Sequence, residues 1–174
     1  MSGFVDRMIG AARLDISTYE EVEADRTATG QAMAVVILSS VAAGIGGLRL
    51  GLGGLVGAII AALIAWFLWA FLAFLIGTKL LPEPQTRSDV GELLRTTGFS
   101  AAPGVLRVLN IIPFLGGIIN FAISIWLLIT MVIAVRQALD YKSTGRSIIV
   151  CLIGWFLYLI IFGGLSLMLG GVIS

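Results

Sequence analysis

Four long runs of uncharged residues constrain this chain more than any other feature of its sequence. They cover residues 27–48, 50–78, 108–135 and 147–174. A helix that crosses a bilayer needs about 20 predominantly apolar residues, so each run is long enough for one crossing. Only 12% of the residues are charged, whereas a soluble domain carries about a quarter. We therefore predict an integral membrane protein with spans at about 29–48, 53–77, 114–136 and 147–170.

A fifth segment, 90–110, is more polar and decides the topology. Its polar residues and its proline recur with the period of an α-helix and fall on one side of it. This polar stripe consists of Glu92, Thr96, Ser100, Pro103, Arg107 and Asn110. Such a helix either lies in the membrane interface or crosses the bilayer with its stripe turned toward other helices.

The distribution of arginine and lysine favours a crossing. If 90–110 crosses, two basic residues, Arg49 and Arg107, fall on one side of the membrane. The other side then carries Arg7, Arg13, Arg26, Lys79, Arg87, Arg95, Arg136, Lys142 and Arg146. The positive-inside rule makes this second side cytoplasmic. If 90–110 does not cross, the numbers of basic residues on the two sides of the membrane differ much less.

We therefore predict an all-α polytopic membrane protein with five transmembrane helices in residues 29–174. Residues 1–28 form a cytoplasmic amphipathic and acidic segment, and the C-terminus lies outside. Pro103 should kink the third helix because it lacks a backbone donor. Glu92 and Arg95 can pair at i and i+3, and Arg107 should lie near the outer interface.

The N-terminal segment predicts two short helices. The first has an apolar side formed by Phe4, Met8 and Ala11, which could rest on the bilayer surface. The second follows from "STYE", which fits a capping box from Ser17 to Glu20. Its acidic stretch is either a solvated helix face or a partner-docking surface. The candidate docking residues are Tyr19, Glu20, Glu21 and Glu23.

Small residues recur every four positions in several predicted helices and permit close helix contact. The longest such seam is Gly53, Gly57, Ala61 and Ala65; shorter ones are Ser40 and Gly44, Ala43 and Gly47, and Gly116, Asn120 and Ser124. These seams serve packing within the chain or a face for a second copy. Asn120 could also hydrogen-bond the polar stripe.

The composition argues against most reactive chemistry. There is no histidine, and Cys151 is the only cysteine, so a serine triad, an intrachain disulfide and a cysteine metal site are excluded. No phosphate-loop motif occurs. The net charge is only +1, so the excess of basic residues typical of a nucleic-acid-binding protein is lacking. We predict no catalytic, cofactor-binding or metal site.

Three stretches, "LDISTYEEVEAD", "LLRTTGFSAAPGVLRVLNIIP" and "MVIAVRQALDYKSTGRSIIVCLIGW", resemble the Yip family of Ypt/Rab-interacting membrane proteins in its short prokaryotic form. The element Gly98-Phe99-Ser100 followed by Pro103 is similar to the Gly-Tyr-Ser…Pro element of the family's third helix, with phenylalanine in place of tyrosine. The resemblance implies five membrane helices, a cytosolic N-terminus, no known catalysis and residence in a prokaryotic cytoplasmic membrane.

The resemblance also bears on partners. Eukaryotic relatives bind small GTPases and associate with one another, but their Asp-Leu-Tyr-Gly-Pro element is not found here, which argues against direct GTPase binding. The expected partners are membrane lipids and other membrane proteins or further copies of the chain. The leading hypothesis is a non-enzymatic membrane organiser, adaptor or accessory subunit of a larger assembly. The alternative is a small transporter or channel whose path is lined by the polar stripe.

Overall fold

The computed structural model describes residues 2–47, 52–112 and 114–173, and these contain helices but no strand. The all-α prediction is therefore confirmed for the described residues. The elements in chain order are α1 (Phe4–Ala12), α2 (Ile16–Ala24), the 3₁₀ turn η1 (Arg26–Ala28), α3 (Thr29–Gly47), α4 (Leu52–Leu75), the π-helical turn η2 (Ile76–Leu80), α5 (Val90–Ser100), the 3₁₀ helix η3 (Ala102–Ile111), α6 (Gly116–Ala138) and α7 (Thr144–Ile173).

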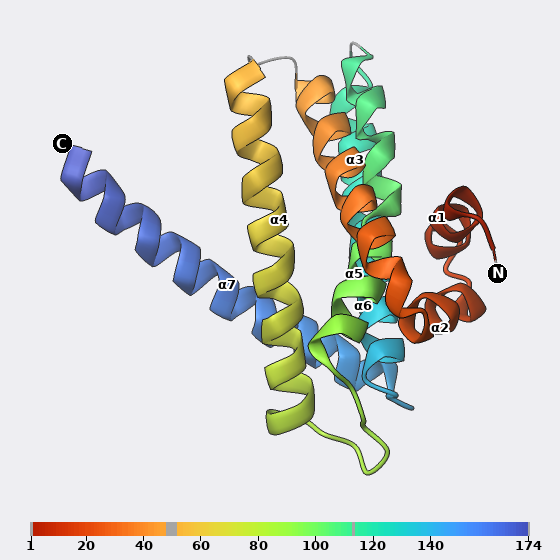
Figure 1. The fold of residues 1–174 in the computed structure, drawn as a ribbon. Coiled ribbons are helices and arrows are strands. Elements are labelled where there is room, and N and C mark those ends of the chain that lie inside the picture. Colours follow the sequence, from red (N-terminus) through yellow and green to blue (C-terminus); the bar gives the residue numbers. More distant parts are fainter. Residues whose placement is uncertain (1, 48–51, 113, 174) are drawn as a thin grey trace.

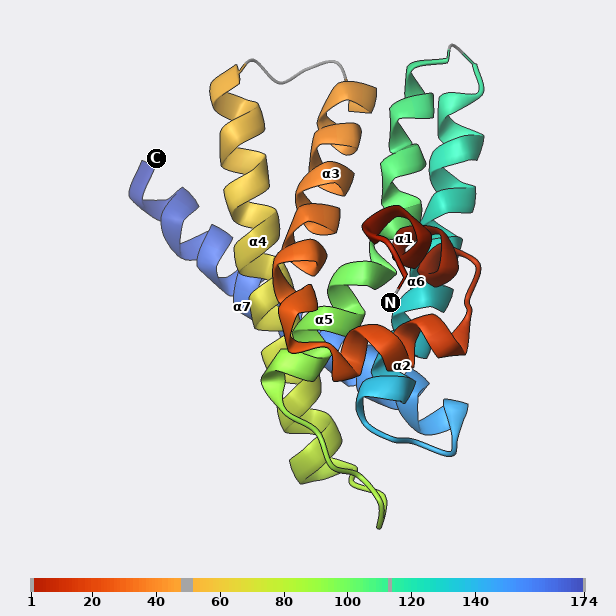
Figure 2. The same cartoon turned by 45° about the vertical axis from the view of Figure 1, so that its right-hand side comes forward.

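Helices α3, α4, α5 with η3, and α6 run side by side, while α7 crosses them obliquely and its C-terminal part leads away from the others (Figures 1 and 2). The segment α5–η3 follows α3 in the same direction along its length. Three contacts fix this register: Gly98 lies against Ala32, Gly104 against Ser39, and Gly46 against the backbone of Arg107. Two hydrogen bonds, from Thr130 to Ser100 and from Asn110 to Asn120, show that α6 runs the opposite way.

Within the described residues, four helices are long and apolar enough to cross a membrane. They are Arg26–Gly46, Gly53–Leu80, Gly116–Ala138 and Thr144–Ile161, and each overlaps one of the four apolar spans expected from the uncharged runs. The segment 90–110 is not among them, because its charged and hydroxyl side chains lower its hydropathy. The structure therefore does not confirm the predicted count of five.

The segment 90–110 also differs from the single α-helix that its periodicity predicts. The α-helix ends at Ser100, and a 3₁₀ helix continues from Ala102 to Ile111. Pro103 lies at the start of this second part and cannot donate an α-helical hydrogen bond. The expected disturbance at Pro103 thus takes the form of a change of helix type, and the polar stripe has α-helical geometry only up to Ser100.

The N-terminal hairpin of α1 and α2 packs against the flank of the bundle (Figure 2). Phe4 meets Phe99 edge-on, with 6.4 Å between ring centroids, and the indole of Trp126 donates to the Ala12 carbonyl at 2.8 Å. Phe4 and Met8 therefore pack against protein rather than forming a free apolar face; contact of α1 with the bilayer surface stays a prediction. Val5 and Ile9, which lie beside this face on α1, are exposed.

The start of α2 is also capped differently from the prediction. Asp15 is the N-cap, and its carboxylate accepts hydrogen bonds from the backbone and hydroxyl of Ser17, at 3.0 and 2.8 Å. The predicted capping box from Ser17 to Glu20 is therefore wrong by two residues. Both Asp and Ser are good N-cap residues, so the local sequence leaves either start open.

Gly98 allows the closest approach between α5 and α3. A Cβ atom placed on it would lie 2.7 Å from the Ala32 Cβ and 3.1 Å from the Ala32 backbone. Real Cβ contacts are longer, so any larger residue would force α3 and α5 apart. Gly57, in contrast, has no neighbour within 4 Å of such an atom.

These two glycines give the first prediction. Gly98→Ala should lower the free energy of unfolding by about 1–3 kcal/mol, the usual cost of overpacking. Gly57→Ala should be neutral or stabilising, because alanine is the better helix former. Reversible unfolding in mixed detergent–SDS micelles measures both. Equal effects of the two substitutions would contradict the close α3–α5 contact.

Candidate functional site

The family-like element Gly98-Phe99-Ser100 lies where α1, α3, α5 and α6 meet. Phe99 is fully buried in a cluster that also contains Tyr19, Val35 and Ala134. The Ser100 hydroxyl donates to the Thr97 carbonyl at 2.7 Å, and the Ser100 carbonyl accepts from Thr130 at 2.8 Å. The element therefore holds four helices together, and its hydroxyl is already engaged.

The polar stripe is divided between two environments. Thr96 and Ser100 are buried and donate to carbonyls of their own helix, at 3.1 Å to Glu92 and 2.7 Å to Thr97. Asn110 donates to Asn120 at 3.3 Å, which confirms the predicted bond between the stripe and that asparagine. Thr96 and Ser100 are thus satisfied within their own helix, whereas the buried Oδ1 of Asn110 has no hydrogen-bond partner among the described residues.

Glu92 does not pair with Arg95. Its carboxylate instead accepts from the Asp89 backbone at 3.0 Å, while the Asp89 carboxylate accepts from the Glu92 backbone at 2.8 Å. This reciprocal capping box begins α5 and stabilises its first turn. The predicted Glu92–Arg95 pair is therefore wrong.

Arg95 is 5% exposed and reaches the C-terminal end of α2. Its Nε donates to the carbonyls of Val22 and Glu23, at 3.0 and 2.9 Å. A cation is favourable at a helix C-terminus, where carbonyls lack partners within the helix. Arg95 thus fastens the N-terminal hairpin to α5 through a contact that no local spacing predicts.

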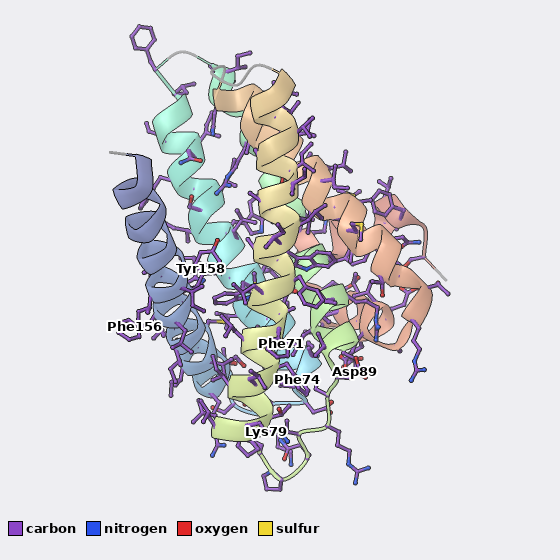
Figure 3. All side chains as sticks on the ribbon, turned by 60° about the vertical axis from the view of Figure 1, so that its left-hand side comes forward. Phe71, Phe74, Lys79, Asp89, Phe156 and Tyr158 are labelled. Carbon is purple, nitrogen blue, oxygen red and sulfur yellow. The ribbon has the colours of Figure 1, made fainter. Side chains whose placement is uncertain are left out.

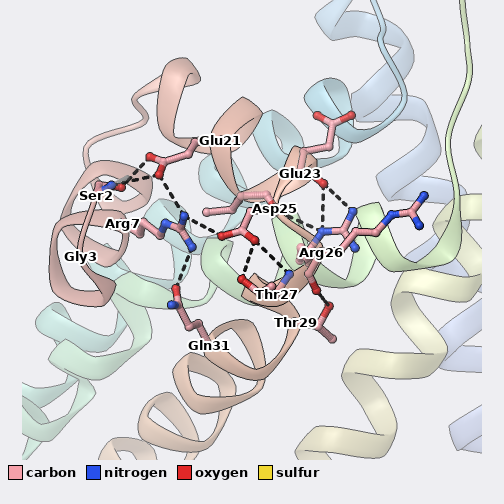
Figure 4. Close-up of polar contacts among 12 residues, drawn as sticks. Ser2, Gly3, Arg7, Glu21, Glu23, Asp25, Arg26, Thr27, Thr29 and Gln31 are labelled. Carbon is pink, nitrogen blue, oxygen red and sulfur yellow. Dashed lines mark hydrogen bonds and ion pairs between the residues drawn. The ribbon is translucent and has the colours of Figure 1, made fainter.

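Arg7 fastens the other side of the hairpin. It is 2% exposed, and its guanidinium donates to Glu21, Asp25 and Gln31, at 2.9, 2.8 and 3.0 Å (Figure 4). Hydrogen bonds from Ser2 and from Arg7 lower the pKa of Glu21 to about 2, and those from Thr27 and Arg7 lower the pKa of Asp25. This network joins α1, α2 and α3.

The predicted docking residues do not form one accessible surface. Tyr19 is fully buried, and its hydroxyl donates to the Ala11 carbonyl at 3.1 Å, so it cannot reach a partner in this conformation. Glu21 belongs to the Arg7 network. Glu20 is exposed, with Gln137 within 3.5 Å, and Glu23 is half-buried.

Glu23 lies where several carboxylates gather. Burial raises its pKa to about 7, helped by the negative charges of Asp140 and Glu92 and opposed by Arg95. A carboxylate with this pKa is partly protonated near neutral pH. The junction of α2, α5 and the turn after α6 is therefore sensitive to pH.

Arg107 lines a cavity between α3 and α4. The cavity has a volume of about 330 Å³. Its other walls are Ser39, Ser40, Ala43, Gly44, Ala58 and Ala62. The Nε atom of Arg107 is buried and has no hydrogen-bond partner among the described residues. Part of the stripe thus faces a hollow, as one of the sequence-based alternatives expects.

Large parts of α4 and α7 face away from the protein. Phe156, on α7, is 65% exposed and points outward (Figure 3). The seam residues Gly53, Gly57 and Ala61 on α4 are exposed, and neither glycine has a neighbour within 4 Å of an added Cβ. This seam is therefore not used for packing within the described residues.

Glu23 gives the second prediction. Its folded pKa of about 7 lies above its unfolded value, so its contribution to stability is fully present below about pH 4.5 and is lost as pH rises through 7. Glu23→Gln should therefore stabilise the protein at pH 8, on the order of 1–2 kcal/mol after solvent screening, and change little at pH 4.5. Unfolding in mixed micelles at both values measures this, with Glu20→Gln as control. A gain that is the same at both pH values would contradict the raised pKa.

Comparison with known proteins gives one match. No curated protein and no solved structure matches the chain. A family model described as the Yip1 domain matches residues 16–165. The matched range runs from the start of α2 into α7 and includes Arg95, Gly98 and Arg107. The chain is therefore an integral membrane protein that belongs to the Yip family.

Proposed function

We propose that this protein is a non-enzymatic membrane organiser, adaptor or accessory subunit that associates laterally through α4. The observation that carries the proposal is the open seam of Gly53, Gly57 and Ala61. Small residues allow two helix backbones to approach closely in a membrane, and nothing in the described part of the chain occupies this position.

The hydrogen bonding of the buried hydroxyls described here supports a non-enzymatic role. The buried hydroxyls of Thr96, Ser100 and Thr130 donate to backbone carbonyls within the protein. The sequence has no histidine that could activate any of them as a nucleophile. These hydroxyls are thus engaged with backbone, and that of Thr130 joins α6 to α5.

We further propose that α5–η3 crosses the membrane as a fifth span, with the N-terminus in the cytoplasm and the C-terminus outside. The support is its register with α3, which it accompanies from Ala32 to Gly46. The polar side chains of its α5 part, Arg95, Thr96, Thr97 and Ser100, are buried among neighbouring helices, a condition under which lipid tolerates them. Lys79 and Asp89 lie at one end of the bundle (Figure 3), which we call the Asp89 end. Phe114, which follows η3, marks the opposite end, which we call the Phe114 end.

Cysteine labelling tests this topology. In a Cys151→Ala background, Arg87→Cys and Phe114→Cys should react with a membrane-impermeant maleimide from opposite sides of the membrane. Both positions are exposed, Phe114 fully so. Labelling of both from the same side would refute the fifth crossing.

Lateral association is tested by a photo-crosslinking amino acid, benzoylphenylalanine, placed at Ala61 or, as a matched control, at Phe156. Both positions are exposed on apolar helices. Irradiation of native membranes should give a discrete protein adduct from position 61 and much less from position 156. Mass spectrometry of the adduct distinguishes a second copy from another protein. Equal yields, or none, would contradict a specific α4 interface.

A small transporter or channel is the second candidate, and the cavity beside Arg107 favours it. Against it, Thr96 and Ser100 are buried and bonded within the protein rather than lining this cavity. Anion flux into liposomes that Arg107→Ala abolishes would support transport. Flux unaffected by the substitution would leave the polar stripe without this role.

A further inference from the structure

We propose that the cavity between α3 and α4 binds an oxyanion through Arg107, and that its ligand is a phosphate group. Two sources supply this chemistry in a membrane: the phosphodiester of a phospholipid and free inorganic phosphate. The inference is independent of lateral association along α4.

The charges of the chain leave Arg107 without an internal counter-ion. The ten acidic residues lie in the N-terminal hairpin, in or beside the loop before α5, and in the turn after α6. They are Asp6, Asp15, Glu20, Glu21, Glu23, Asp25, Glu83, Asp89, Glu92 and Asp140. No residue of the cavity wall is acidic, and the ion pairs of the described residues involve Arg7 and Arg146.

The side chain of Arg107 is directed inward. The backbone of Arg107 touches Gly46 near the end of α3, whereas the cavity wall extends along α3 back to Ser39. Side chains on a helix lean toward its N-terminus, which here is the direction of Ser39. The half-buried side chain therefore borders the cavity, and its buried Nε has no partner among the described residues.

An arginine in this position needs an anion. The guanidinium stays charged under all ordinary conditions; the Arg107 side chain is half-buried, and its buried Nε has no protein acceptor among the described residues. Since the protein provides no carboxylate here, the partner must come from outside the chain. Phosphate suits the planar guanidinium because its oxygens accept two parallel hydrogen bonds.

The rest of the wall fits this ligand. Ser40 donates to the Val36 carbonyl at 2.8 Å, which leaves the Ser39 hydroxyl as the second donor beside Arg107. The four remaining wall residues are glycine or alanine, so their small side chains leave the volume of about 330 Å³ open. Apolar residues of α4 such as Val56 and Ile60 are exposed nearby in the chain and can contact acyl chains.

Native mass spectrometry of the full-length protein tests the site. The protein in mild detergent is titrated with phosphatidylglycerol and then released from the detergent in the spectrometer. In a second arm, its thermal unfolding is measured with and without inorganic phosphate. The wild type should retain phospholipid, and Arg107→Gln should weaken retention by about tenfold or more, as expected for the loss of a charge-assisted hydrogen bond. Arg107→Lys should retain an intermediate affinity, because lysine keeps the charge but loses the bidentate geometry. Arg26→Gln, an exposed arginine outside the cavity, should leave binding unchanged.

A second variant separates binding from folding. Ala58→Leu fills the cavity without removing the charge, so it should also weaken binding while Arg107 remains. Phospholipid retention that depends on both positions identifies the lipid as the source. Stabilisation by inorganic phosphate alone, with the same dependence, identifies the free anion. Binding of neither, or binding unaffected by Arg107→Gln and Ala58→Leu, overturns the proposal.

Discussion

The fold depends on enclosing one polar helix among apolar ones. Hydrocarbon offers no hydrogen-bond partners, so each polar group at bilayer depth needs an acceptor or donor within the protein. In α5 the hydroxyls of Thr96 and Ser100 return to carbonyls of the same helix, and Thr130 of α6 donates to the Ser100 carbonyl. The bond from Thr130 requires α6 close to α5, and the neighbouring helices keep Thr96 and Ser100 buried. Helices α4 and α7, which lie at the periphery, can then remain apolar around most of their circumference.

Two of three arginines in the bundle have their charge balanced within the protein, each in a different way. Arg7 is neutralised by Glu21 and Asp25. Arg95 lies at the C-terminus of α2, where the carbonyls of Val22 and Glu23 accept hydrogen bonds from its guanidinium. The N-terminal hairpin is thus part of the folded core, because without α2 the buried charge of Arg95 would have no hydrogen-bond acceptors. Arg107 has neither solution among the described residues, and this difference distinguishes it from the other two.

The sequence predicts well what depends on long patterns and poorly what depends on distant contacts. The uncharged runs locate four spans, because crossing a bilayer imposes length and apolarity directly. The bond between Asn110 and Asn120 was also predictable, since two amides in apolar surroundings gain from meeting. Local spacing misassigned Arg95, because its true acceptors, Val22 and Glu23, lie about 70 residues earlier in the chain. It also missed the 3₁₀ helix after Ser100, since residues three apart, such as Arg107 and Asn110, fall on one side of either helix type.

The two ends of the bundle differ in how their charges are balanced, and this bears on function. Toward the Asp89 end, carboxylates and arginines from the hairpin and the loops compensate one another. Toward the Phe114 end, Arg107 faces a cavity wall without a carboxylate, so balance must come from the surroundings. The open glycines Gly53 and Gly57 belong to the half of α4 next to this end. Ala58 and Ala62 face the cavity while Gly57 and Ala61 face outward, so one helix can receive an anion on one side and a neighbouring helix on the other. In the proposed adaptor, the anion and the partner helix would both contact α4.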